Sequence, residues 1–175
     1  MEKRRAGNSG LELSRLGLGT MTWGRDTDEI EAADQCRAYL DAGGNFLDTS
    51  PAYGDGDSER LIGGLISTLF KRDEVIIASK AGINHNENAR RINATRAFLI
   101  ADLDRTLERL GTDFIDLWQI SNWDDLTPID ETLSALDYAY TTGRARYVGV
   151  SNYAGWQVAL AAAKQQSNSM KAPLT

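Results

Sequence analysis

The chain has 175 residues, of which 42% are hydrophobic and 25% are charged, and this composition indicates a globular domain rather than a disordered segment. Its formal net charge of −6 argues against a broad nucleic-acid-binding face, because such a face would be basic. It has one cysteine, no apolar run near the N-terminus that would make a secretory signal, and no stretch apolar enough to cross a membrane, so we expect a cytoplasmic protein that binds neither nucleic acid nor membrane.

Strand-like and helix-like segments alternate along the chain, after a short hairpin expected at 6–15 with its turn at 8–10. Short apolar runs predict five strands, at 16–19, 45–47, 75–79, 114–120 and 145–150. Capping residues, apolar residues every three or four positions and glycines that end the pattern predict five helices, at 26–43, 58–69, 95–111, 127–143 and 156–166. Each predicted strand is therefore followed by a predicted helix.

Some of these predictions depend on single residues. In the first helix, Asp26 is the expected N-cap, and the expected buried face consists of Ile30, Ala33, Cys36 and Leu40. In the fourth helix, the residues expected to face inward are Leu133, Leu136 and Tyr140. The stretch GINHNENARR, which contains His85, is predicted to be a long polar loop.

Five βα units in succession demand a parallel sheet with right-handed crossovers. An open doubly wound sheet and a closed (β/α)8 barrel both meet this demand. The first strand-to-helix turn, LGLGTMTWG, lacks the G-x-G-x-x-G spacing of a dinucleotide-binding sheet because position 22 is threonine, so we predict the barrel. A barrel needs eight units, and a sixth strand would begin at 173–175. We therefore expect residues 1–175 to form one domain, the N-terminal portion of a barrel cut short after its fifth helix.

Polar residues stand at the ends of four successive predicted strands. Asp48 ends the second strand, Lys80 ends the third, and a Ser-Asn pair ends each of the next two, at 121–122 and 151–152. Tyr53 lies on the loop that follows Asp48. The carboxyl ends of barrel strands meet at one mouth, where active sites are found. The sequence therefore predicts one site built from these residues.

The residue types at this mouth indicate proton donation to a carbonyl. A free phenol is a weak acid near neutrality, and a neighbouring ammonium favours its ionised form. Lys80 can act on Tyr53 in this way, and Asp48 would keep Lys80 charged and oriented. Tyr53 could then protonate a carbonyl oxygen while the carbonyl carbon gains a hydride. Because no side chain donates hydride, a nicotinamide cofactor is implied.

A set of motifs between about Leu16 and Ala163 resembles the aldo/keto reductase superfamily: LGLGTM, LDTSPAYGDGDSERLIG, SK, RLGTDFIDLWQ and GRARYVGVSN. The resemblance implies a (β/α)8 barrel that binds NADP(H) without a Rossmann fold and reduces a small carbonyl substrate. It also assigns roles to individual residues of this chain. The positions that match the family's catalytic residues are Asp48, Tyr53 and Lys80, and those expected to bind the cofactor are Gly19, Thr20, Met21, Asp48, Ser151 and Asn152.

The chain departs from the family pattern at the end of the fourth strand. The family's catalytic histidine falls on Ser121, which is followed by Asn122, and Asn122 could replace the histidine only if the strand end shifts by one residue. Trp23 could form a wall of the substrate pocket beside Tyr53, or it could pack in the core. No metal site is expected, because the chain has one histidine and one cysteine.

Three functions stay open on the sequence. The first is an NADP(H)-dependent enzyme that reduces aldehydes or ketones to alcohols, with Tyr53 as the proton donor. The second is an NADP(H)-binding subunit or sensor with weak catalysis, which the serine at position 121 favours. The third is an incomplete barrel that is inactive alone and could self-associate, because unpaired strand edges invite pairing with another chain.

Overall fold

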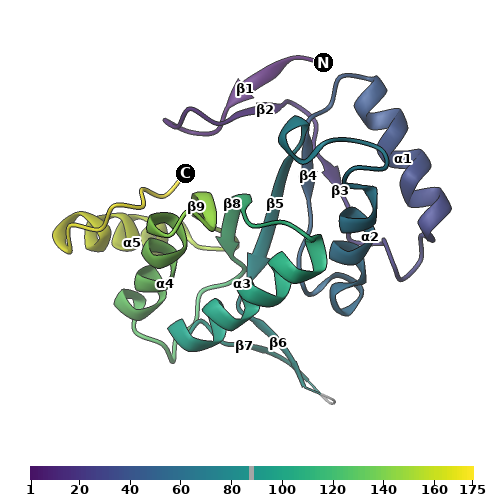
Figure 1. The fold of residues 1–175 in the computed structure, drawn as a ribbon. Helices are drawn as coiled ribbons and strands as arrows, with labels where there is room; N and C mark the ends of the chain where they lie inside the picture. The colour runs from purple at the N-terminus through teal and green to yellow at the C-terminus, as the bar shows by residue number, and fades with distance from the viewer. Residues whose placement is uncertain (87–88) are drawn as a thin grey trace.

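The computed structural model describes residues 1–86 and 89–175, and its centre is a parallel sheet of five strands (Figure 1). The strands pair in chain order, as β3 (Leu18–Gly19), β4 (Phe46–Asp48), β5 (Ile76–Ala81), β8 (Ile115–Ile120) and β9 (Ala145–Val150). A helix follows each strand, namely α1 (Glu29–Asp41), α2 (Asp57–Leu65), α3 (Arg96–Leu110), α4 (Ile129–Thr141) and α5 (Gly155–Ser167). This arrangement confirms the predicted alternation of strands and helices.

The two faces of the sheet belong to two separate hydrophobic clusters. Side chains alternate along a strand, so residues two apart share a face. Leu47, Ile77 and Trp118 face the helices and join the main core, where they meet Leu99 and Leu103 of α3. The residues between them face the other way and form a smaller cluster, with Phe46, Ile76, Ala78, Leu117 and Tyr147. The helices cover only the first face, and we call the second one the concave face.

A hairpin of β1 (Lys3–Arg5) and β2 (Glu12–Ser14) packs at the amino ends of the strands (Figure 1). Leu11, beside its turn, is 7% exposed and belongs to the concave-face cluster. The amide of Ser14 donates to Asn45 Oδ1 at 2.7 Å, just before β4. The predicted hairpin is therefore present and begins earlier than expected, and it leaves the carboxyl ends of the strands uncovered.

The last residues of the chain lie beside β9. Leu174 forms a parallel bridge with Val148, and the Thr175 amide donates to the Val148 carbonyl at 2.9 Å. This is where the sequence predicts the beginning of a sixth strand. No helix among the described residues is long and apolar enough to cross a membrane.

Helix α1 differs from its prediction at its cap and at one residue of its expected buried face. Asp28, not Asp26, is the N-cap, and its carboxylate accepts a hydrogen bond from the Glu31 amide at 2.9 Å. Cys36 is buried as predicted, and Ala33 and Leu40 pack against the main core, but Ile30 is 76% exposed and Ala32 is buried instead. The helix has few large apolar residues, so its sequence does not select one face strongly, and packing against α2 decides which face is buried.

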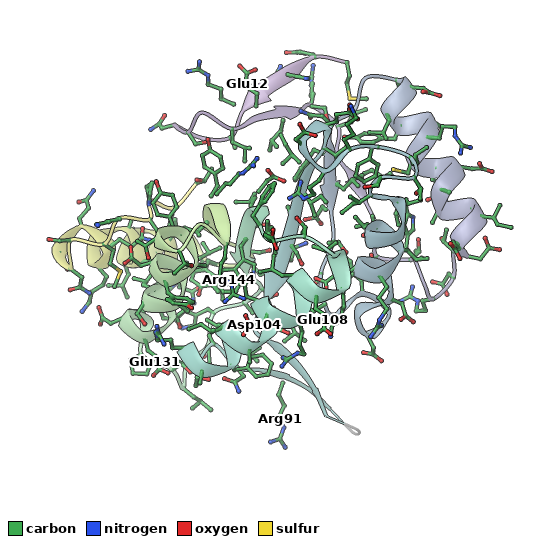
Figure 2. All side chains as sticks on the ribbon, in the orientation of Figure 1. Glu12, Arg91, Asp104, Glu108, Glu131 and Arg144 are labelled. Atoms are coloured by element: carbon green, nitrogen blue, oxygen red, sulfur yellow. The ribbon has the colours of Figure 1, made fainter. Side chains whose placement is uncertain are left out.

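Three further differences concern the stretch GINHNENARR, the end of α2 and the exposure of Tyr140. The stretch expected as a polar loop forms a hairpin of β6 (Ile83–Asn86) and β7 (Ala89–Ile92), and exposed Arg91 points from it away from the molecule (Figure 2). The prediction for the His85 side chain lies outside the described residues. Helix α2 ends at Leu65, because the backbone of Ile66 is extended and Ser67 then turns the chain with a left-handed φ of 71°. Tyr140 is 36% exposed rather than turned inward.

We expect Ile62→Ala to lower the free energy of unfolding by about 2–5 kcal/mol, because Ile62 on α2 is fully buried in the main core and its loss leaves a cavity. The matched variant Ile30→Ala should change it by less than about 0.5 kcal/mol, because Ile30 is 76% exposed. Urea unfolding of both variants provides the measurement. Equal losses would contradict the burial assigned to α1.

Candidate active site

Lys80 is the centre of a polar cluster at the carboxyl ends of β4 and β5. Its Nζ donates to both carboxylate oxygens of Asp48 at 2.8 Å, to the Thr49 carbonyl oxygen at 3.1 Å and to the Tyr53 hydroxyl at 3.4 Å. The side chain of Lys80 is 13% exposed, and that of Asp48 is 32% exposed. The structure therefore brings together the three residues that the sequence singles out, with the ammonium between the carboxylate and the phenol.

Strand register explains why these side chains meet. Asp48 pairs with Ala78 in the parallel β4–β5 ladder, and Lys80 follows Ala78 by two residues. Because side chains two residues apart share a face, Asp48 and Lys80 both lie on the concave face. Lys80 in turn pairs with Gln119, and Ser121 follows Gln119 by two residues. Successive strands thus deliver their last polar residue to the same side of the sheet.

Tyr53 is held by a tight loop between β4 and α2. Its amide donates to the Ser50 carbonyl at 3.0 Å, and a 3-10 turn (Tyr53–Gly56) follows. Gly56 has a φ of 91°, and a Cβ at this position would lie 2.5 Å from Arg109 Nε. Only glycine meets both conditions without strain. The glycines of AYGDGDSER therefore serve the local geometry that carries Tyr53.

The ends of β8 and β9 are joined through Asn152. Its side-chain amide donates to the Ser121 carbonyl at 2.8 Å and to Ser151 Oγ at 3.2 Å, and its backbone has a left-handed φ of 57°. Ser121 is 4% exposed, and its Oγ has no hydrogen-bond partner within the part of the chain that the structure describes. Asn122 is half-buried at the bend that follows β8. The two Ser-Asn pairs are thus neighbours, as their strand positions predict.

The residues at the end of β3 and just after it divide into accessible and buried ones. Gly19 pairs with Asp48 across the ladder, and a Cβ added to Gly19 would meet no described atom within 4 Å. Met21 is 56% exposed. Thr20 is fully buried, and its amide and hydroxyl donate to the Asp48 carbonyl at 3.0 and 3.1 Å. Trp23 is also fully buried and donates to Gln35 Oε1 at 2.9 Å, which corresponds to the core-packing alternative for this residue.

Sequence reasoning missed an aromatic group beside the Ser-Asn pairs. The Trp123 ring lies 5.3 Å from that of Tyr153 and 5.5 Å from that of Trp156, both edge to face. Burial raises the pKa of Tyr153 to about 12, and the nearby Asp124 acts in the same direction. The signal in the sequence is weak: each of these aromatic residues follows a predicted strand end by a few positions.

It also missed two buried polar residues at the start of α2, Ser58 and Glu59, which are both 0% exposed. Glu59 accepts hydrogen bonds from Ser79 Oγ at 2.7 Å, Thr106 Oγ1 at 3.0 Å and Arg109 Nη1 at 2.9 Å. Burial raises the pKa of Glu59, and these donors oppose that rise. A signal was present, because Ser58 and Glu59 precede the buried Ile62 by four and three residues and so share its helical face.

Among the described residues, no group of three or more His, Cys, Asp or Glu side chains is arranged to hold a metal ion. The strands pair in chain order, the helices cover one face of the sheet, and polar side chains stand at the carboxyl ends of successive strands, which is the arrangement of the β/α-barrel class of proteins. Residues 15–172 match the sequence model of the Aldo/keto reductase family, and the chain belongs to this family.

Relatives with known names agree with this assignment. The chain is 40% identical over 158 residues to the aldo-keto reductase YhdN of Bacillus subtilis, covering 87% of this chain and 47% of the relative. It is 36% identical over 161 residues to L-glyceraldehyde 3-phosphate reductase of Escherichia coli K12, covering 87% of this chain and 46% of that protein. The chain thus spans about half the length of the curated relatives it matches.

A solved structure gives the same result for the fold. The aldo-keto reductase AKR11C1 from Bacillus halodurans, in its holo form, matches with a TM-score of 0.79 and 33% sequence identity. The match covers 87% of this chain and 50% of that chain. The predicted fold class, a barrel of the (β/α)8 family represented by five βα units, is confirmed.

Proposed function

We propose that this chain supplies the amino-terminal strands of an NADP(H)-dependent oxidoreductase that reduces the carbonyl of an aldehyde or ketone to an alcohol. The observation that carries the proposal is the position of Lys80 Nζ, 2.8 Å from both carboxylate oxygens of Asp48 and 3.4 Å from the Tyr53 hydroxyl. Membership of the aldo/keto reductase family and the reductase names of its relatives support the same reaction.

The accessible residues at the strand ends suit a nicotinamide nucleotide. Met21 is 56% exposed, Asn152 is exposed, and the backbone of Gly19 faces open space among the described residues. The contacts of Ser151 and Asn152 leave the Asn152 side-chain oxygen as an acceptor for an amide of the ligand. Thr20 is buried and would contribute indirectly, by holding the Asp48 carbonyl through two hydrogen bonds. When bound, the nicotinamide group supplies the hydride.

The protein residues supply the proton and stabilise the group that gives it up. The Tyr53 hydroxyl donates its proton to the carbonyl oxygen of the substrate as negative charge develops there. The Lys80 ammonium, 3.4 Å from that hydroxyl, stabilises the negative charge that forms on the phenol oxygen. Asp48 fixes the direction of the Lys80 side chain, because both carboxylate oxygens accept from Nζ.

Tyr53→Phe should lower kcat for the reduction of para-nitrobenzaldehyde by NADPH at least about 100-fold, because it removes the proton donor. The dissociation constant for NADPH, measured by fluorescence titration, should stay nearly unchanged. Tyr39→Phe is the matched control, because the Tyr39 hydroxyl bonds to Leu16 and Phe46 carbonyls at the opposite ends of the strands. Unchanged reduction by Tyr53→Phe would refute the assignment of the proton donor.

The buried Ser121 favours a second candidate function, an NADP(H)-binding subunit or sensor with weak catalysis. Its Oγ has no partner among the described residues, so the Ser121 hydroxyl is not fixed toward a substrate oxygen. If this candidate is right, the protein binds NADPH tightly and reduces aldehydes slowly.

For the second candidate, Ser121→His should raise kcat for aldehyde reduction at least about tenfold, because an imidazole N–H would then be able to orient the substrate oxygen. Ser167→His, at the exposed end of α5, is the control and should leave kcat as it is. Steady-state kinetics with NADPH in excess give the comparison. Rapid reduction by the wild-type protein with no gain from Ser121→His would exclude the sensor and support the reductase.

A further inference from the structure

A buried cluster of three hydroxyl groups adjoins the Asp48–Lys80 pair. Ser58 Oγ is 2.6 Å from Thr20 Oγ1, 2.9 Å from Thr49 Oγ1, and donates to the Thr20 carbonyl at 3.0 Å. All three side chains are 0% exposed. Buried hydroxyls are stabilising only when their hydrogen bonds are made, and Ser58 is the member of the cluster that contacts both threonine hydroxyls.

The three residues come from three different segments. Thr20 follows β3, Thr49 follows β4, and Ser58 is in the first turn of α2. Thr20 holds the Asp48 carbonyl through its amide and its hydroxyl, at 3.0 and 3.1 Å. The Thr49 carbonyl accepts from Lys80 Nζ at 3.1 Å. The cluster therefore fixes the backbone around Asp48. It also fixes the Thr49 carbonyl, which accepts a hydrogen bond from the Lys80 ammonium.

The same cluster closes the loop that carries Tyr53. Thr49 and Ser58 bound this loop, and their hydroxyls meet at 2.9 Å. Between them, Gly54, Asp55 and Gly56 all have positive φ, so the loop has a tight and specific shape. Because the loop ends are joined, the distance from its tyrosine to Lys80 is set by the cluster as well as by the loop's own turns.

We propose that Ser58 is a positioning residue for the proposed reduction: its hydroxyl joins Thr20 to Thr49 and thereby holds Tyr53 in register with Lys80. The proposal rests on the proposed function for its catalytic consequence, whereas the effect on the loop is independent of activity. Removing the Ser58 hydroxyl leaves the Thr49 hydroxyl and the Thr20 carbonyl without this partner, and the Tyr53 loop gains freedom.

Ser58→Ala and Thr49→Val should each lower kcat for para-nitrobenzaldehyde about 10- to 100-fold, because small displacements of a reacting group are costly. The KM for the aldehyde and the dissociation constant for NADPH should change less than about threefold. Thr49→Ser, which keeps a hydroxyl, should recover most of the loss. Two chemically different substitutions are used so that misfolding of one does not decide the result.

The matched control is Ser14→Ala. Ser14 is also buried, at 4% exposure, and its Oγ bonds to the Leu16 carbonyl at 2.8 Å and the Tyr39 hydroxyl at 2.7 Å, but at the amino ends of the same strands. It should lower the unfolding midpoint as Ser58→Ala does while kcat stays within about twofold of wild type. Loss of kcat in parallel with stability in all variants, Ser14→Ala included, would overturn the positioning role.

Hydrogen–deuterium exchange separates this proposal from the proposed function. Amides at 50–57 should exchange about tenfold faster in Ser58→Ala and Thr49→Val than in wild type or Ser14→Ala. If the wild-type protein reduces no aldehyde but the exchange of these amides is faster in the two variants, the proposed function is wrong. The claim that Ser58 restrains the Tyr53 loop is then still supported. If the wild-type protein is active, and neither exchange nor kcat responds to the two substitutions, the positioning role of Ser58 is wrong.

Discussion

The site depends on the ion pair between Lys80 and Asp48. A mostly buried ammonium is costly unless its charge and its hydrogen bonds are satisfied, and here a carboxylate with both oxygens at 2.8 Å meets most of that need. The Thr49 carbonyl supplies a further acceptor, and the Tyr53 hydroxyl is the remaining neighbour. The charge pair thus joins β4 to β5 and directs a cation at the phenol.

Alternation along parallel strands explains why the pair forms where it does. Asp48 and Lys80 near the ends of β4 and β5, and Ser121 and Ser151 just beyond β8 and β9, lie an even number of residues from paired positions of the ladder, so all four lie on the concave face. Their neighbours of opposite parity face the helices, as Ser79 does toward Glu59. This part of the fold and site could be predicted from the sequence, because strand ends and a period of two are local properties.

The remainder could not be predicted, because it depends on contacts between distant segments. The weak apolar pattern of α1 predicts Ile30 as buried, whereas the helix, which packs against α2, has Ala32 buried and Ile30 exposed. Ser58 reads as a helix-start residue, yet its hydroxyl meets Thr20, 38 positions earlier in the chain. Such a bond leaves no periodic signal. The scaffold and the main polar residues were therefore predictable, whereas the groups that hold them in place were not.

A double-mutant cycle on the charge pair tests the account most directly. Asp48→Asn, Lys80→Met and the double variant would be compared by kcat/KM for NADPH-dependent reduction of para-nitrobenzaldehyde. If the two residues act as one unit on Tyr53, the kcat/KM of the double variant should be within about threefold of that of the less active single variant. Losses that multiply in the double variant would show that Asp48 and Lys80 act independently, which would contradict the central role of their ion pair.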